Sequence, residues 1–127
     1  MADDVSNSTA ETPTEAAAEQ ALAFLNEMSP DIRGAAILAG DGSVLAANGD
    51  ANRWREDAAA LFAAADRADE APAEQIHIGT EQGEVLALRH SGLAAVAVTE
   101  RFALASLLLF DMRALLRDLA AGGDGEA

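Results

Sequence analysis

Histidine and cysteine are the residue types that most readily bind metals or take part in catalysis. This chain has two histidines, His77 and His90, and no cysteine. Neither histidine has a sequence neighbour at metal-ligand spacing, and Ser91 beside His90 lacks the surroundings of a nucleophile elbow. The carboxylates are numerous and scattered, which is typical of a solvated acidic surface. We therefore expect structural or surface roles for both histidines, and no catalytic residue, metal or cofactor.

Gly40-Asp41-Gly42 is a second place where chemistry could arise, because glycine and aspartate build phosphate cradles, metal loops and plain turns. A phosphate-binding loop needs a Gly-Lys-Ser/Thr ending that opens a helix, but this chain has no lysine and the segment leads into a short apolar run. A calcium loop needs several spaced oxygen ligands, and only Asp41 is present. The pattern predicts a tight turn between two strands.

Composition excludes several classes of function. The chain has 127 residues, a net charge of -14 and eight arginines as its only basic side chains, so it would repel a nucleic acid backbone. The first residues are acidic and lack the features of a signal peptide, and no apolar run approaches the ~20 residues of a membrane span. We expect a cytoplasmic protein that binds no nucleic acid and does not insert into a membrane.

The positioning elements follow from hydrophobic periodicity. Residues 1–11 are expected to be a disordered acidic N-terminus, residues 12–121 one domain, and residues 122–127 a flexible acidic tail. The first helix is predicted to have Thr12 as its N-cap and Pro13 as its first residue, and to end at Ser29-Pro30. A last helix is predicted over residues 102–120, with an apolar stripe of Leu104, Leu107, Leu108, Met112, Leu115, Leu116 and Leu119.

Strands are predicted over residues 32–39, 43–47, 74–80, 84–90 and 93–99, and a second helix over about residues 53–68, capped by Asp50 or Asn52. The first and last strands are apolar on both faces and belong inside the sheet. The element order α-β-β-α-β-β-β-α then predicts an α/β (α+β) fold. We expect a five-stranded antiparallel sheet in the order 2-1-5-4-3, with helices on both faces.

The second helix is the informative element, because residues 58–65 of its middle are all apolar. Its row facing the core is predicted to be Trp54, Ala58, Leu61, Phe62 and Ala65. The opposite row, Ala59, Ala60, Ala63 and Ala64, is predicted to form a dimer seam, with the edge strand carrying Ile76 and Ile78 beside it. The alternative is a helix buried within a larger monomeric core. Arg53, Arg55 and Asp57 are either partner contacts or an ordinary charged helix start.

The element order, the hairpin "RGAAILAGDGSVLAANG", the alanine-rich helix and the ending "GLAAVAVTERFALASLLLFDMRALLRDL" resemble the roadblock / dynein light chain family, which is related to the profilin and longin folds. The resemblance covers roughly residues 13–120. It implies a homodimer or roadblock heterodimer that joins third strands and second helices and docks a small Ras-like GTPase. In the bacterial branch, such proteins act as GTPase-activating or regulatory partners.

The resulting hypothesis is a dimeric, non-enzymatic regulatory module that binds a small Ras-like GTPase and modulates its nucleotide cycle. Two alternatives stay open. One is a small-ligand sensor of profilin-like or PAS-like shape, with a pocket under the sheet. The other is a purely structural scaffold subunit without effect on GTP hydrolysis. An enclosed apolar void would favour the sensor, and an exposed apolar patch on the second helix would favour the interaction module.

Overall fold

The sheet is built from five short strands, and helices cover both of its faces. A computed structural model describes residues 12–68, 72–101 and 103–122. The elements in chain order are α2 (Glu15–Met28), β1 (Ile32–Ala39), β2 (Val44–Ala47), α3 (Ala51–Ala68), β3 (Gln75–Gly79), β4 (Glu84–His90), β5 (Leu93–Thr99) and α4 (Ala105–Ala120). The strand order is β2-β1-β5-β4-β3, with every pair antiparallel, so the predicted fold class and sheet order are confirmed.

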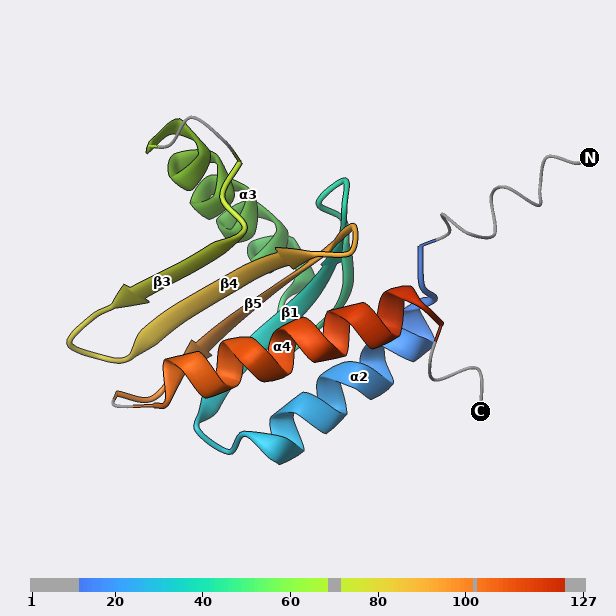
Figure 1. The fold of residues 1–127 in the computed structure, drawn as a ribbon, viewed down its shortest axis with the longest axis horizontal. Coiled ribbons are helices and arrows are strands. Elements are labelled where there is room, and N and C mark those ends of the chain that lie inside the picture. The colour runs from blue at the N-terminus through green and yellow to red at the C-terminus, as the bar shows by residue number, and fades with distance from the viewer. Residues whose placement is uncertain (1–11, 69–71, 102, 123–127) are drawn as a thin grey trace, which may run out of the picture.

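The two central strands are apolar on both sides because each side meets a different helical layer. Ile37 of β1 and Ala95 of β5 belong to the core under α2 and α4, whereas Leu38 and Val96 belong to the core under α3. Figure 1 shows α2 and α4 side by side on one face of the sheet and α3 behind the other. None of the helices within the described residues is long and apolar enough to cross a membrane.

The start of α2 differs from the prediction by two residues. Thr14, rather than Thr12, is the N-cap, and Pro13 lies before the helix. The Thr14 hydroxyl accepts a hydrogen bond from the backbone N–H of Ala17 at 3.0 Å, which satisfies one of the free donors of the first turn. Both threonines are good caps by type, and the chain uses the one adjacent to Glu15.

The start and the rotation of α4 also differ from the prediction. The helix begins at Ala105, so Leu104 lies outside it, and the expected start at Phe102 falls outside the described residues. The stripe was predicted wrongly at Leu104 and Leu107, which are exposed. Its partly buried member Leu115 packs against the core. The buried positions of the helix are Leu108, Leu109, Met112, Leu116 and Leu119, of which Leu109 was not predicted.

The segment Gly40-Asp41-Gly42 forms the predicted turn between β1 and β2. The Asp41 carboxylate accepts hydrogen bonds from the backbone N–H and the hydroxyl of Ser43, at 2.9 and 2.7 Å. These bonds hold the pKa of Asp41 below its ordinary value. Gly42 has a φ of +93°, which other residue types rarely adopt. The residues that drew attention as a candidate phosphate or metal loop are thus used to reverse the chain.

Candidate protein-interaction surface

The outer row of α3 is a strip of small apolar side chains. Ala59, Ala60, Ala63 and Ala64 are all exposed or partly exposed, while Ala58 and Phe62 on the other side of the helix are buried. Trp54, Leu61 and Ala65 are partly buried, as expected for the flanks of the row facing the core. The helix starts at Ala51, and Asp50 caps it by accepting from the backbone N–H of Asn52 at 2.9 Å. Ala59 and Ala63 border a hollow between α3 and the β1–β2 turn, whereas Ala60 and Ala64 do not line it. The role of the row as a seam stays a prediction.

The strand β3 forms one edge of the sheet. Within the described residues it pairs with β4 alone, so its outer edge carries unpaired backbone groups. Ile76 and Ile78 stand opposite Ala87 and Val85 of β4 and share their face, which is the face that α3 covers in part. Ile76 is partly buried there, and Ile78 is 42% exposed.

An open groove of about 500 Å³ lies between the first half of α3 and the sheet. It exists because α3 packs against β1 and β2, which leaves Val85 near the start of β4 and Val98 near the end of β5 partly uncovered on this face. Apolar side chains dominate the groove, and charged side chains from the start of α3 rim it. Its lining residues are Asp50, Arg53, Trp54, Asp57, Ala58, Leu61, Val85, Val96 and Val98. Sequence reasoning missed the groove, because three valines in strands give no sign of which ones a helix covers.

The charged start of α3 divides into two groups. Arg53 and Asp57 both line the groove and face each other across one helical turn, with 4.0 Å between the guanidinium Nε and a carboxylate oxygen. Both side chains are largely exposed, so their attraction contributes little to stability. Arg55 is exposed and does not line the groove. The structure therefore brings two of the three predicted contact residues to one rim and leaves Arg55 apart.

Arg89 of β4 fixes the end of α3 to the sheet. Its guanidinium donates to both carboxylate oxygens of Asp66 at 3.0 Å and to the Ala73 carbonyl at 3.0 Å, and it lies 4.2 Å from the centroid of the Phe62 ring. The hydrogen bonds from Arg89, followed by the one from the backbone N–H of Ala73, hold the pKa of Asp66 below its ordinary value. The bidentate pair and the cation–π contact together set the position of the helix.

Trp54 fixes the other end of α3. Its indole Nε1–H donates to the carbonyl of Asn48 at 2.7 Å, and the Asn48 side chain in turn accepts from the backbone N–H of Ala35 at 2.9 Å. The ring lies over Gly34 of β1, where an added Cβ atom would be 3.3 Å from it. The only tryptophan of the chain is thus both an anchor of α3 and a wall of the groove.

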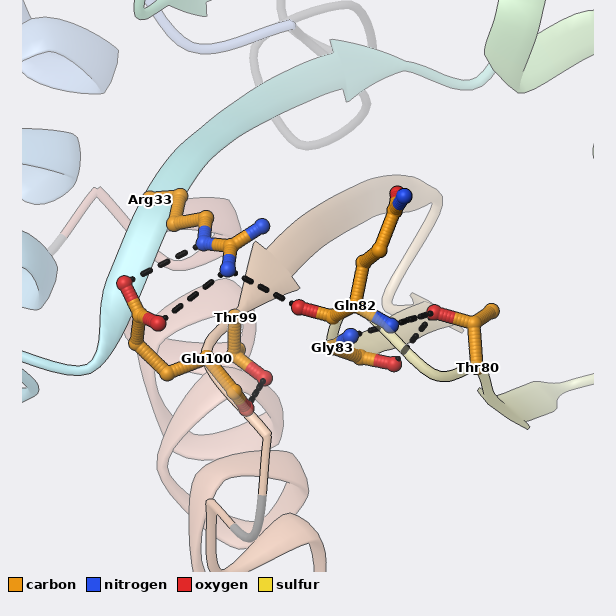
Figure 2. Close-up of polar contacts among 6 residues, drawn as sticks. All are labelled: Arg33, Thr80, Gln82, Gly83, Thr99 and Glu100. Carbon is orange, nitrogen blue, oxygen red and sulfur yellow. Dashed lines mark hydrogen bonds and ion pairs between the residues drawn. The ribbon is translucent and has the colours of Figure 1, made fainter.

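The end of the sheet nearest Val98 is held by a network of polar contacts (Figure 2). Arg33 donates to both carboxylate oxygens of Glu100 at 3.1 Å and to the carbonyl of Gln82 at 2.8 Å. The hydrogen bonds from Arg33 lower the pKa of Glu100. Thr80 closes the β3–β4 turn by accepting from the backbone N–H groups of Gln82 and Gly83. This network ties β1, the β3–β4 turn and the residue after β5 into one unit.

The two histidines lie apart from the groove. His77 pairs with Glu84 of the neighbouring strand through its Nε2, on the face of the sheet opposite Ile76 and Ile78. His90 ends β4 and is partly buried, next to the turn in which Ser91 has a φ of 56°. The part of the chain that the structure describes contains no group of three His, Cys, Asp or Glu residues placed to hold a metal ion.

Solved structures of this fold are known. A Roadblock/LC7 domain from Streptomyces avermitilis matches at 20% identity with a TM-score of 0.68, over 82% of this chain and 95% of that one. The gliding protein MglB from Thermus thermophilus matches at 14% identity with a TM-score of 0.71, over 87% and 91%. An MglB structure with a tetrameric arrangement matches at 19% identity with a TM-score of 0.62, over 91% and 93%.

The likeness is one of three-dimensional structure. No protein-family model and no curated protein matches the sequence. The described residues form the α/β fold of Roadblock/LC7 domains, so the resemblance inferred from the sequence is confirmed at the level of the fold. MglB has the same fold, over nearly the full length of both chains.

Proposed function

We propose that this protein is a dimeric, non-enzymatic regulatory module that binds a small Ras-like GTPase and modulates its nucleotide cycle. The observation that carries the proposal is that three features occur together at α3 and the adjoining sheet. These are the exposed alanine row of α3, the edge of β3 that pairs with no other described strand, and the apolar groove between the first half of α3 and the sheet. The likeness to MglB and Roadblock/LC7 structures supports the same reading.

The dimer joins α3 to α3 and β3 to β3 around a twofold axis, as the resemblance to the roadblock family implies. Ala60 and Ala63 suit this role, because small side chains let two helices approach closely. In such a dimer the exposed side chain of Ile78 would be covered by a contact across the joined edge strands. The known tetrameric arrangement of MglB supports self-association of this fold.

The GTPase partner follows from the family resemblance. The module would act by positioning the switch loops of the partner, and Arg53, Arg55 and Asp57 are the proposed contacts. Arg53 and Asp57 are better placed than Arg55 to reach a partner that covers the groove, since both line its rim.

The dimer is tested by the double variant Ala60→Glu/Ala63→Glu. Each glutamate would be buried against its own copy in the seam, which should turn the dimer into a folded monomer. Sedimentation measures the mass, and circular dichroism measures the fold. The matched control is Ala16→Glu/Ala23→Glu, which adds the same charge to exposed alanines of α2 and should stay dimeric.

Two outcomes would contradict this arrangement. A double variant that unfolds would mean that the alanines belong to the core of a monomer. A double variant that stays dimeric would place the seam elsewhere, for example around Leu107 and Phe110.

The GTPase is tested by measuring GTP hydrolysis and nucleotide release by small Ras-like GTPases from the same genome, with and without the protein. We expect a change in either rate that is lost with Ala60→Glu/Ala63→Glu and reduced with Arg53→Ala. Binding without any change in rate would identify the scaffold subunit instead. Binding of a small apolar molecule in the groove, without any GTPase binding, would identify the sensor.

A further inference from the structure

The helical face opposite α3 exposes more large apolar side chains than the proposed seam does. Within the described residues six large hydrophobic side chains are exposed, and five of them belong to α2 or to residues 104–110, at and just before the start of α4. These are Phe24 (55% exposed), Met28 (41%), Leu104 (69%), Leu107 (54%) and Phe110 (67%). Scattered exposed apolar residues need no explanation, but a concentration of this kind on one layer marks an interaction surface.

Phe24 and Met28 line a groove between α2 and α4, two helices that lie side by side (Figure 1), and we call it the α2–α4 groove. Phe110 borders a separate hollow that also contains His77 of β3.

The volume of the α2–α4 groove is about 400 Å³. Phe24 and Met28 line its α2 wall, and Ala114 and Leu115 line its α4 wall. Asp111 also belongs to the α4 wall, and Leu107, one helical turn before it, extends that wall towards the start of α4.

The α2–α4 groove is independent of the proposed seam, because the sheet lies between them. Phe24 and Leu107 belong to the layer whose core contains Leu22 and Met112, whereas α3 packs on the core around Phe62. A dimer built through α3 and β3 leaves the α2–α4 groove open on both copies. The groove therefore stays available for another partner.

The charged residues around the α2–α4 groove indicate which kind of partner it would bind. The helix α2 carries Glu15, Glu19 and Glu27 and no basic residue. Asp111 and Asp118 are the charged residues that line the groove. Asp118 pairs with Arg117, while Asp111 forms no ion pair within the described residues. A second copy of this chain would bring another net charge of -14 to an acidic site, which disfavours self-docking here.

The dimensions decide its form. Helices of 14 and 16 residues frame the groove. At ~1.5 Å per residue these two helices are about 21–24 Å long, which sets the length of the groove. We propose that the α2–α4 groove docks a basic amphipathic helix of an unlike protein partner. Such a helix places apolar side chains at i, i+3, i+4 and i+7 against Phe24, Met28 and Leu107, and its cationic side chains beside Asp111.

The test uses a fluorescently labelled synthetic 18-residue peptide of leucine and lysine, with leucine at i, i+3, i+4 and i+7. A scrambled peptide of the same composition is the reference, because it has the same charge and no apolar face. Fluorescence anisotropy with the full chain should show at least tenfold tighter binding of the amphipathic peptide. Equal binding of both peptides would mean attraction by net charge alone and would overturn the proposal.

Two variants locate the binding. Phe24→Gln/Leu107→Gln keeps the charge and should weaken binding of the amphipathic peptide at least tenfold, while Asp111→Asn should weaken it a fewfold and reduce its salt dependence. The control Phe110→Gln removes an exposed aromatic side chain of α4 that does not line the groove, and it should leave binding unchanged. The proposal is overturned if Phe110→Gln abolishes binding or if the double variant binds as well as the wild type.

Two further measurements address other occupants. If Ala60→Glu/Ala63→Glu still self-associates and Leu107→Gln abolishes that association, a second copy is the occupant and the proposal is wrong. Sedimentation of the full chain with anionic lipid vesicles should show no binding, and vesicle binding lost with Phe24→Gln/Leu107→Gln would identify a membrane instead. The peptide and vesicle measurements do not depend on whether a GTPase binds, so their outcomes leave the proposed function untouched. Continued self-association of Ala60→Glu/Ala63→Glu, in contrast, would also contradict the proposed seam.

Discussion

Gly83 lies so close to the backbone of Thr99 that a Cβ atom on Gly83 would come within 2.0 Å of the Thr99 carbonyl oxygen. Both residues are buried, and the network around Thr80 and Arg33 holds the turn against β5 (Figure 2). The Gly83→Ala variant must push β4 and β5 apart, so we expect it to lose about 3 kcal/mol of stability. Urea unfolding followed by circular dichroism measures the loss.

The control for this variant is Gly79→Ala. The nearest atoms to a Cβ atom on Gly79 belong to the Glu84 carboxylate at 3.9 Å, which is an ordinary contact with a movable side chain. We expect its stability to lie close to that of the wild type. Equal stability of Gly83→Ala and Gly79→Ala would show that the close approach to Thr99 is not a constraint.

Phe62→Ala should be the most damaging change on α3. The ring is only 8% exposed and contacts the Arg89 guanidinium, so truncation leaves a cavity and removes a cation–π contact, at a cost of about 3–4 kcal/mol. Phe24→Ala removes the same atoms from an exposed site and should cost about 0.5 kcal/mol. Chemical denaturation of both variants tests the difference. A similar loss for both would mean that Phe62 does not anchor the helix.

Asp66→Asn should change how stability depends on pH. The pKa of Asp66 is lowered in the folded state by Arg89, so its stabilising contribution is present above the ordinary aspartate value of about 4 and is lost as pH falls through the lowered pKa. The difference in unfolding free energy between wild type and Asp66→Asn should therefore be greatest at neutral pH and shrink in acid. Taking this difference cancels the effect of acid on the net charge. A difference that stays constant down to about pH 2 would contradict the prediction.

The protein itself should not bind GTP or ATP. It has no lysine, and its Gly40-Asp41-Gly42 segment leads into a strand rather than a helix. Isothermal titration calorimetry with each nucleotide and magnesium should give no binding heat. Micromolar binding of either nucleotide would contradict the prediction and reopen the question of enzymatic activity.

The fold was predictable because a run of consecutive apolar residues in each central strand indicates burial on both faces of the sheet. Ile37, Leu38, Ala95 and Val96 are apolar at consecutive positions, which only a covered central strand tolerates. The rotation of α4 was not predictable in the same way. Its run of leucines around Leu107 offers several apolar stripes of similar quality, and only the packing against the sheet selects one.

Only part of the candidate interaction surface could be predicted from the sequence. The exposure of Ala60 and Ala63 follows from helical periodicity once Phe62 is assigned to the core. The groove depends instead on where α3 rests along the sheet, which the Trp54–Asn48 and Arg89–Asp66 contacts decide. Such pairings between distant residues leave no trace in local spacing, and so Val85 and Val98 could not be recognised as groove residues.

The pairing of β1 with β5 has a consequence for how the chain folds. Ile37 pairs with Ala95, so the central pair of the sheet closes a long loop that contains β2, α3, β3 and β4. Closing it is entropically costly and links residues far apart in sequence, a high contact order that slows folding. Because α3 packs on β1 and β2 while β3 pairs with β4, these two segments reach their final positions relative to each other only when β1 pairs with β5. Assembly through them should therefore be a late kinetic step, one that depends on protein concentration and follows completion of each protomer.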